Sequence, residues 1–215
     1  MGRKRAEDCV KSQKTLVKRE KTWYNKLTQK DNRRIRKVPA GNMTGDMEFT
    51  MYAIGDRIVH PMHGAGVVED IVTKRINGTA REYYIFRAPG AKIMVMIPLE
   101  SCEEIGVRPV VDERSAQRVL EEFPILKTDP QVNWNKRYRD NMLRIKSGNL
   151  TEVSRVVKGL MLRERKKALS TGERRMLNAA RQILLSELVF ATGRTESELS
   201  TVLDEMIPAE SENEG

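Results

Sequence analysis

Residue types that carry chemistry are scarce in this chain of 215 residues. The two cysteines, Cys9 and Cys102, have dissimilar surroundings, which argues against a disulfide framework and suits a reducing cytoplasm. The two histidines, His60 and His63, lack the further ligands that a metal site needs, so we expect a role at a strand end or turn. Nucleophile elbows, phosphate-binding loops and paired carboxylates are missing too. These absences predict a protein that is not an enzyme and that uses no cofactor or metal.

Long apolar segments are missing as well. The longest unbroken apolar run, residues 93–97, is far shorter than the roughly 20 residues of a membrane-spanning helix. The N-terminus is basic, but the apolar segment of a secretory signal does not follow it. We therefore expect a cytoplasmic protein without membrane contact.

Basic residues are abundant and unevenly placed. The formal net charge is +9, and residues 1–46 hold 14 basic against 5 acidic residues. Residues 130–181 hold 14 basic and 4 acidic residues, whereas residues 182–215 hold 1 and 8. A chain polarised in this way favours a polyanionic partner.

The two ends of the chain have biased compositions. Residues 1–46 are basic and poor in apolar residues, so we expect an extension without a packed core. It is either a nucleic-acid-binding arm or a segment upstream of the true translation start, which would then be Met43, Met47 or Met51. Residues 209–215 form an acidic tail.

Residues 47–110 have the pattern of a β domain. Asn77-Gly78 suits a tight hairpin turn, and Pro89-Gly90 provides a second turn. We expect about five short strands, at residues 54–60, 67–72, 83–86, 93–97 and 102–105. Short strands with tight turns favour a small closed or half-closed barrel.

Residues 111–208 have the pattern of a helical domain. Ser170 with Glu173 and Thr195 with Glu198 have capping-box spacing, in which hydroxyl and carboxylate each satisfy a backbone amide. The residues that suit helix N-caps are Asp112, Asn133, Asn149, Ser170 and Thr195. The fold class is therefore α+β with segregated domains, a small β-barrel followed by an all-α domain.

Trp134 has unusual neighbours, because asparagines flank it and Lys136, Arg137 and Arg139 follow. Either the ring packs in the core and anchors a helix, or the cations hold phosphates while the ring stacks or wedges between bases. The basic run at residues 163–167 also has two interpretations. It binds nucleic acid, or it is a solvated helix end whose cations complement the helix dipole.

Several motifs together resemble the CarD family of bacterial transcription regulators. The helical half contributes Asn-Trp-x-x-Arg-Tyr (133–138), Lys-Ser-Gly (146–148) and Leu-Ser-x-Gly-Glu-x-Arg-Met-Leu (169–177). The β half contributes Ile-Gly-Asp-x-Ile-Val-His-Pro-x-His-Gly-x-Gly (54–66), Glu-Tyr-Tyr (82–84), Pro98 and Ile-Gly-Val-Arg (105–108). The β half alone would also fit the polymerase-interacting domain of transcription-repair coupling factors. The helical half, and a chain too short for a helicase motor, favour the CarD family.

The resemblance implies a Tudor-like domain that docks on the β subunit of bacterial RNA polymerase, and a helical domain that meets promoter DNA. It implies that Trp134 wedges into the minor groove at the upstream edge of the transcription bubble, without reading sequence, and stabilises the open complex. The family positions near the DNA backbone are Lys136, Arg137 and Arg139, with Arg174 and Arg175 as weaker candidates.

The resemblance also implies polymerase contacts at Lys74 and Met96, two positions at which the family pattern has arginine. Lys74 keeps the charge but Met96 does not. Docking is therefore expected to rely on strand addition and apolar contact through Val95, Met96 and Ile97, or on compensation by Arg75. We expect a monomer that reaches the nucleoid through polymerase.

Two other functions remain open. A general nucleic-acid-binding protein of the ribosome or nucleoid would act through residues 1–46. A pure protein-protein adaptor would have an inert helical domain, which the charge of residues 130–181 disfavours.

Overall fold

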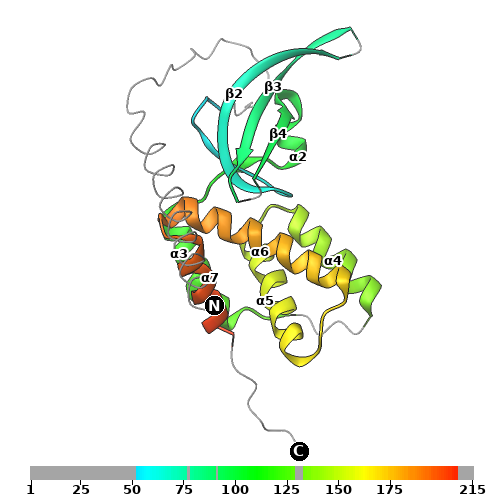
Figure 1. Cartoon of the computed structure of the whole chain (residues 1–215), viewed down its shortest axis with the longest axis vertical. Helices are drawn as coiled ribbons and strands as arrows, with labels where there is room; N and C mark the ends of the chain where they lie inside the picture. Colours follow the sequence, from blue (N-terminus) through cyan, green and yellow to red (C-terminus); the bar gives the residue numbers. More distant parts are fainter. Residues whose placement is uncertain (1–51, 77, 91, 129–132, 208–215) are drawn as a thin grey trace, which may run out of the picture. The chain divides into compact units, whose positions relative to one another are not determined.

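The computed structural model describes residues 52–76, 78–90, 92–128 and 133–207 (Figure 1). These residues belong to one compact unit, 51–215. The expectations for the basic extension of residues 1–46, for Asn77 and for the acidic tail of residues 209–215 lie outside the described residues.

The first part of the described chain is a five-stranded antiparallel sheet. Its strand order is β4-β3-β2-β1-β5, so β4 and β5 are the outer strands. The strands are β1 (Arg57–His60), β2 (Gly64–Ile76), β3 (Thr79–Ala88), β4 (Ile93–Pro98) and β5 (Arg108–Pro109). Among the described residues the pairings form one open series, so the sheet is established while closure into a barrel stays a prediction.

The strand expected at residues 102–105 is wrong. After a 3₁₀ turn, η1 (Leu99–Ser101), these residues form a short helix, α2 (Cys102–Ile105). Glu103 and Glu104 are consecutive and both exposed, which a half-buried strand with alternating faces does not allow. Gly106, in the left-handed conformation at φ 84°, ends the helix, and the fifth strand starts at Arg108.

β2 and β3 continue past β4 as a two-stranded ribbon (Figure 1). Their pairing runs from Val67 opposite Arg87 to Ile76 opposite Thr79, whereas β4 pairs only with residues 83–88 of β3. The side chains of residues 73–76 and 79–82 are therefore exposed on both faces. Outside this ribbon, the five-stranded sheet covers an apolar core. Its buried residues include Ile58, Val68, Tyr84, Phe86 and Ile97.

The second part is all helical, as expected, and every predicted N-cap is confirmed. Asp112, Asn133, Asn149, Ser170 and Thr195 each accept a hydrogen bond from a backbone amide, and the last two close capping boxes. The elements are α3 (Glu113–Glu122), η2 (Phe123–Ile125), α4 (Trp134–Lys146), α5 (Leu150–Lys166), α6 (Thr171–Thr192) and α7 (Glu196–Glu205).

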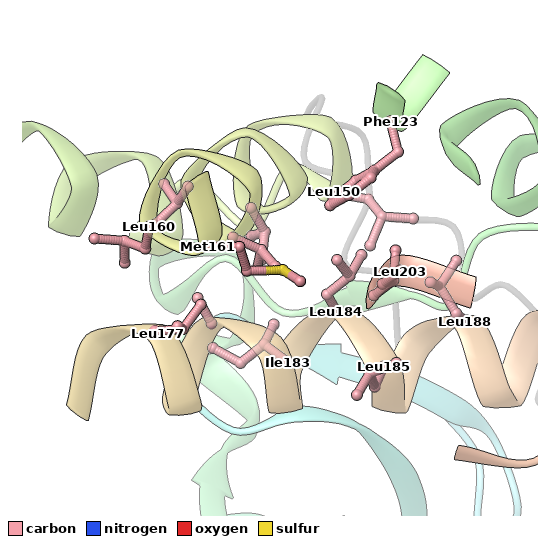
Figure 2. Close-up of a cluster of buried hydrophobic side chains, with 14 of the residues drawn as sticks. Phe123, Leu150, Leu160, Met161, Leu177, Ile183, Leu184, Leu185, Leu188 and Leu203 are labelled. Carbon is pink, nitrogen blue, oxygen red and sulfur yellow. The ribbon is translucent and has the colours of Figure 1, made fainter. Parts of the chain in front are cut away.

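The helices enclose one apolar core. Figure 2 shows Leu160 and Met161 of α5 above Leu177 and Leu184 of α6, with Leu203 of α7 beside them. These side chains are almost fully buried, and each leucine removed from water contributes roughly 1.5–3 kcal/mol. Within the described ranges, none of the helices combines the length and apolarity needed to cross a bilayer.

Helix α6 also packs directly on the sheet. The amide of Ala65 donates to Ser186 Oγ at 2.9 Å, and Phe190 joins a small apolar cluster with Val59, Ala65 and Val67. Gly64 has φ 79° and no space for a Cβ, because Ser186 Oγ occupies it. The close approach of β2 to α6 therefore depends on a glycine.

Candidate functional site

Trp134 is the first residue of α4 and lies at the surface. Its exposed fraction is 45 %, which contradicts the interpretation as a core anchor. The ring stacks on Tyr138, one turn along the helix, with centroids 5.4 Å apart and an interplanar angle of 26°. A Cβ on Gly172, in the first turn of α6, would lie 3.6 Å from Trp134 Cζ2, so the ring rests beside that turn. The indole is therefore supported at one end and open to solvent.

Exposed cations lie on the same two helix ends. Lys136 and Arg139 are exposed on α4, and Arg174 and Arg175 on the first turns of α6. Arg174 forms a long ion pair, with its Nη2 3.8 Å from Glu164 Oε1. Guanidinium and ammonium groups in this setting bind phosphate oxygens well.

Arg137 differs from these four cations because it is buried, with an exposed fraction of 8 %. Its Nε and Nη2 donate to Glu173 Oε1 at 3.1 and 2.6 Å. Burial against Glu173 gives Arg137 a structural role, and its expected place near the DNA backbone stays a prediction. The guanidinium joins α4 to the start of α6, three residues after Trp134.

Glu173 collects several donors at this point. Arg163 Nε lies 3.1 Å from Oε1, and Ser170 donates to Oε2 through its amide at 3.1 Å and its hydroxyl at 2.9 Å. Burial alone would raise the pKa of Glu173, but hydrogen bonds from Arg137 and Ser170 and the charge of Arg137 outweigh it and lower the pKa. Glu173 is thus held as a carboxylate.

The basic run at residues 163–167 divides into two groups. Arg163 pairs with Glu173, and Arg165 donates to the carbonyl oxygens of Ile207 at 2.6 Å and Asp204 at 3.0 Å. Lys166 and Lys167 are exposed. The arginines therefore join α5 to α6 and to the end of α7, whereas the lysines form the solvated helix end.

Both the helical part and the sheet part of the chain match known family models. Residues 118–204 match the model of the CarD C-terminal domain, and residues 52–111 match that of the CarD-like/TRCF RID domain. The putative transcription factor YdeB of Bacillus subtilis (strain 168) is 36 % identical over 151 residues, which covers 70 % of this chain and 99 % of YdeB. The chain belongs to the CarD family. Its general function is therefore transcription regulation.

The sheet corresponds to the RID part of this CarD family chain, and it carries the second candidate surface. Lys74 and Arg75 are exposed on the β2–β3 ribbon, where Lys74 lies opposite Arg81. β4 is an outer strand, so one of its edges lacks a strand partner among the described residues. An unpaired edge of this kind can accept a strand from a partner.

The side chains of β4 alternate between the two faces of the sheet. Met96 is 36 % exposed, but Ile97 is buried at 1 % and Val95 packs against the same sheet core. The side chains of Val95 and Ile97 therefore face the sheet core, and the expected polymerase contact of these residues, which strand addition would make through their backbone, stays a prediction. Met94, two residues from Met96 on the same face, is 58 % exposed and was missed, although the period-2 alternation of a strand would have found it.

His60 and His63 form part of the turn that leads into β2. Their rings lie 4.5 Å apart, and His60 Nδ1 accepts a hydrogen bond from the Met62 amide at 3.1 Å. Burial, with the neighbouring His63, lowers the pKa of His60 to about 4, so the imidazole is neutral at physiological pH. Among the described residues, three or more potential ligands do not gather into a metal site.

Proposed function

We propose that this CarD family chain binds the β subunit of RNA polymerase through its sheet and stabilises the open promoter complex by inserting Trp134 into the minor groove at the upstream edge of the bubble. The observation that carries this proposal is the exposed indole, which stacks on Tyr138 and belongs to a helix start with exposed cations.

Insertion of Trp134 would shift the equilibrium between the closed and the open promoter complex without any chemical step. Inserting an apolar side chain between closed base pairs costs a few kcal/mol of unstacking, and it costs less where the duplex has already opened. A ligand shifts an equilibrium by its difference in affinity for the two states. A preference of ~1.4 kcal/mol for the open form therefore raises the ratio of open to closed complexes about tenfold. It slows collapse by the same factor when the transition state for collapse has already lost the contact.

Phosphate contacts hold the wedge in place. Lys136 and Arg139 on α4, with Arg174 and Arg175 on α6, contact the backbone and carry no sequence information. Promoter choice accordingly comes from the polymerase. The sheet supplies this recruitment through the free edge of β4, the exposed methionines Met94 and Met96, and the cations of the ribbon.

The lifetime of open complexes on a linear promoter fragment, measured after a heparin challenge, tests this proposal. We expect the wild-type chain to lengthen the lifetime and Trp134→Ala to lose this effect while still binding polymerase. Leu143→Ala is the matched control, because Leu143 is an apolar residue of the same helix that is 67 % exposed. A Trp134→Ala variant as active as wild type would disprove the wedge.

A second candidate function rests on the charge of residues 1–46. With 14 basic residues, this segment alone could bind nucleic acid of the ribosome or nucleoid. A chain of residues 47–215 separates the two functions. It retains the lifetime effect under the first proposal and loses nucleic-acid binding under the second.

A further inference from the structure

Arg108 connects three elements that lie far apart in the sequence. It belongs to β5, the last strand of the sheet, and its Nη1 and Nη2 contact the two carboxylate oxygens of Glu187 in α6 at 2.5 and 2.8 Å. Its Nε and Nη2 also donate to the carbonyl oxygen of Gly148 at 2.8 and 2.6 Å. We call these three residues the Arg108 junction.

Glu187 is fully buried at this junction. Its exposed fraction is 0 %, and besides Arg108 the amide of Val111 donates to Oε1 at 3.3 Å. A buried carboxylate is tolerated only with charged or hydrogen-bonding partners, and the planar guanidinium fork supplies both at once. The direction of the Arg108 side chain is therefore fixed by a group that cannot turn to solvent.

Gly148 follows Ser147, the C-cap of α4, and α4 is the helix that begins with Trp134. It adopts φ 66°, and a Cβ at this position would lie 3.6 Å from both Pro61 and the Gly106 carbonyl oxygen. The C-terminal end of α4 thus rests on the sheet domain. The 13 residues of α4 span about 20 Å, so a tilt of ~10° at Gly148 would displace Trp134 by about 3 Å.

We propose that Arg108 is a positioning residue that fixes the direction in which α4 presents Trp134 relative to the sheet. The proposal rests on the function proposed above, in which the sheet is held by polymerase and the indole must reach one step of the DNA. A functional side chain stays within about 0.5 Å of its working position only when buried partners hold the element that carries it. The Arg108 junction therefore couples docking to wedging.

The fold does not depend on the junction alone. Ser186 and the cluster of Val59, Ala65, Val67 and Phe190 attach the sheet to α6 independently of Arg108. Arg108→Gln is therefore expected to remain folded, and Arg108→Lys and Glu187→Gln provide milder changes. Lysine keeps the charge but cannot contact both Glu187 oxygens and the Gly148 carbonyl oxygen together, so it should restore the function in part.

Spin labels in the full chain test the geometry directly. Asp70 on β2 and Asn135 in the first turn of α4 are both exposed, and each is replaced by cysteine in a Cys9→Ser background. Burial raises the pKa of Cys102 to about 11, so this thiol is not labelled. We expect one narrow distance distribution between the labels in wild type and a clearly broader one with Arg108→Gln. An unchanged distribution would overturn the proposal.

The functional measurement uses unlabelled chains. We expect Arg108→Gln to shorten the wild-type lifetime extension about tenfold, while binding to the polymerase β subunit and to DNA, each measured alone, stays within about twofold. Asp204→Asn is the control, because it breaks the Arg181–Asp204 pair between α6 and α7, away from the sheet. It should leave both the distance distribution and the lifetime unchanged.

The outcomes separate the two proposals. A broad distribution with an unchanged lifetime would disprove the coupling role of Arg108 and leave the wedge intact. A wild-type chain without any lifetime effect would disprove the function proposed above, and the distance measurement would still decide whether Arg108 fixes α4.

Discussion

The two candidate surfaces of this protein are built in opposite ways. The outer strand β4 offers backbone groups and alternating side chains, and its buried neighbours are apolar. The surface around Trp134 rests on a buried carboxylate, Glu173, that receives two arginines and a serine. The backbone hydrogen bonds of a strand edge do not depend on side chains, so a single side-chain change on β4 should weaken binding only in part. The indole surface rests on a few buried charged residues, so single changes at those buried residues should have large effects.

The largest effect is expected at Glu173. Glu173→Ala leaves the guanidinium of Arg137 buried without its carboxylate, which costs about 3–5 kcal/mol of unfolding free energy. Glu164→Ala is the control, since its pair with Arg174 is exposed and worth less than about 1 kcal/mol. Urea unfolding measures both variants, and equal losses would show that the surface around Trp134 does not depend on Glu173.

The second largest loss of unfolding free energy is expected in the sheet, at side chains of β4 that face the core. Ile97→Ala removes a side chain that is 1 % exposed and should lower the unfolding free energy by about 2–4 kcal/mol. Met96→Ala on the same strand should change it by less than about 0.5 kcal/mol and should instead weaken polymerase binding. The reverse pattern, measured by urea unfolding and a binding titration, would contradict the assignment of faces on β4.

The pH dependence of stability sharpens the same contrast. The pKa of Glu173 is lowered on folding, so its ionised form stabilises the fold above the ordinary value of 4.5, and this contribution is lost as the pH falls through the folded-state pKa. The difference in unfolding free energy between wild type and Glu173→Gln should therefore be largest near neutral pH. It should shrink as the pH drops below 4.5. A constant difference would mean that the Glu173 charge is irrelevant.

The smallest effect is expected from single surface cations. Lys136→Gln should weaken DNA binding a few-fold on all sequences and reduce the slope of log affinity against log salt by about 1. Lys92→Gln, an exposed lysine of the sheet part, is the control and should leave the slope unchanged. A loss of affinity restricted to some DNA sequences would instead indicate base readout by Lys136.

Local signals in the sequence were sufficient for the helices. Asp112, Asn133 and Asn149 cap helices because a short polar side chain next to an amphipathic segment can satisfy free amides, and this chemistry is visible within four residues. Residues 102–105 were misread because the apolar residues at their ends suggested a strand, while Gly106 as a helix terminator was overlooked.

Long-range partners decide what local patterns cannot. Arg137 and Arg139 look alike in the sequence, but the partner that buries Arg137 is Glu173, 36 residues further on. Glu173 was recognised as a capping residue, and nothing near it in the chain revealed its second role. The Arg108 junction is equally hidden, since Gly148 and Glu187 lie 40 and 79 residues away from Arg108.

The stacked indole of Trp134 also provides an optical signal. Trp23 and Trp134 are the two tryptophans of the sequence, so a chain of residues 47–215 contains a single indole. Its emission arises from the half-exposed ring beside Tyr138, where stacking between bases would quench it. The proposed insertion would therefore be seen as a loss of this emission when the chain of residues 47–215 binds DNA, without an added dye.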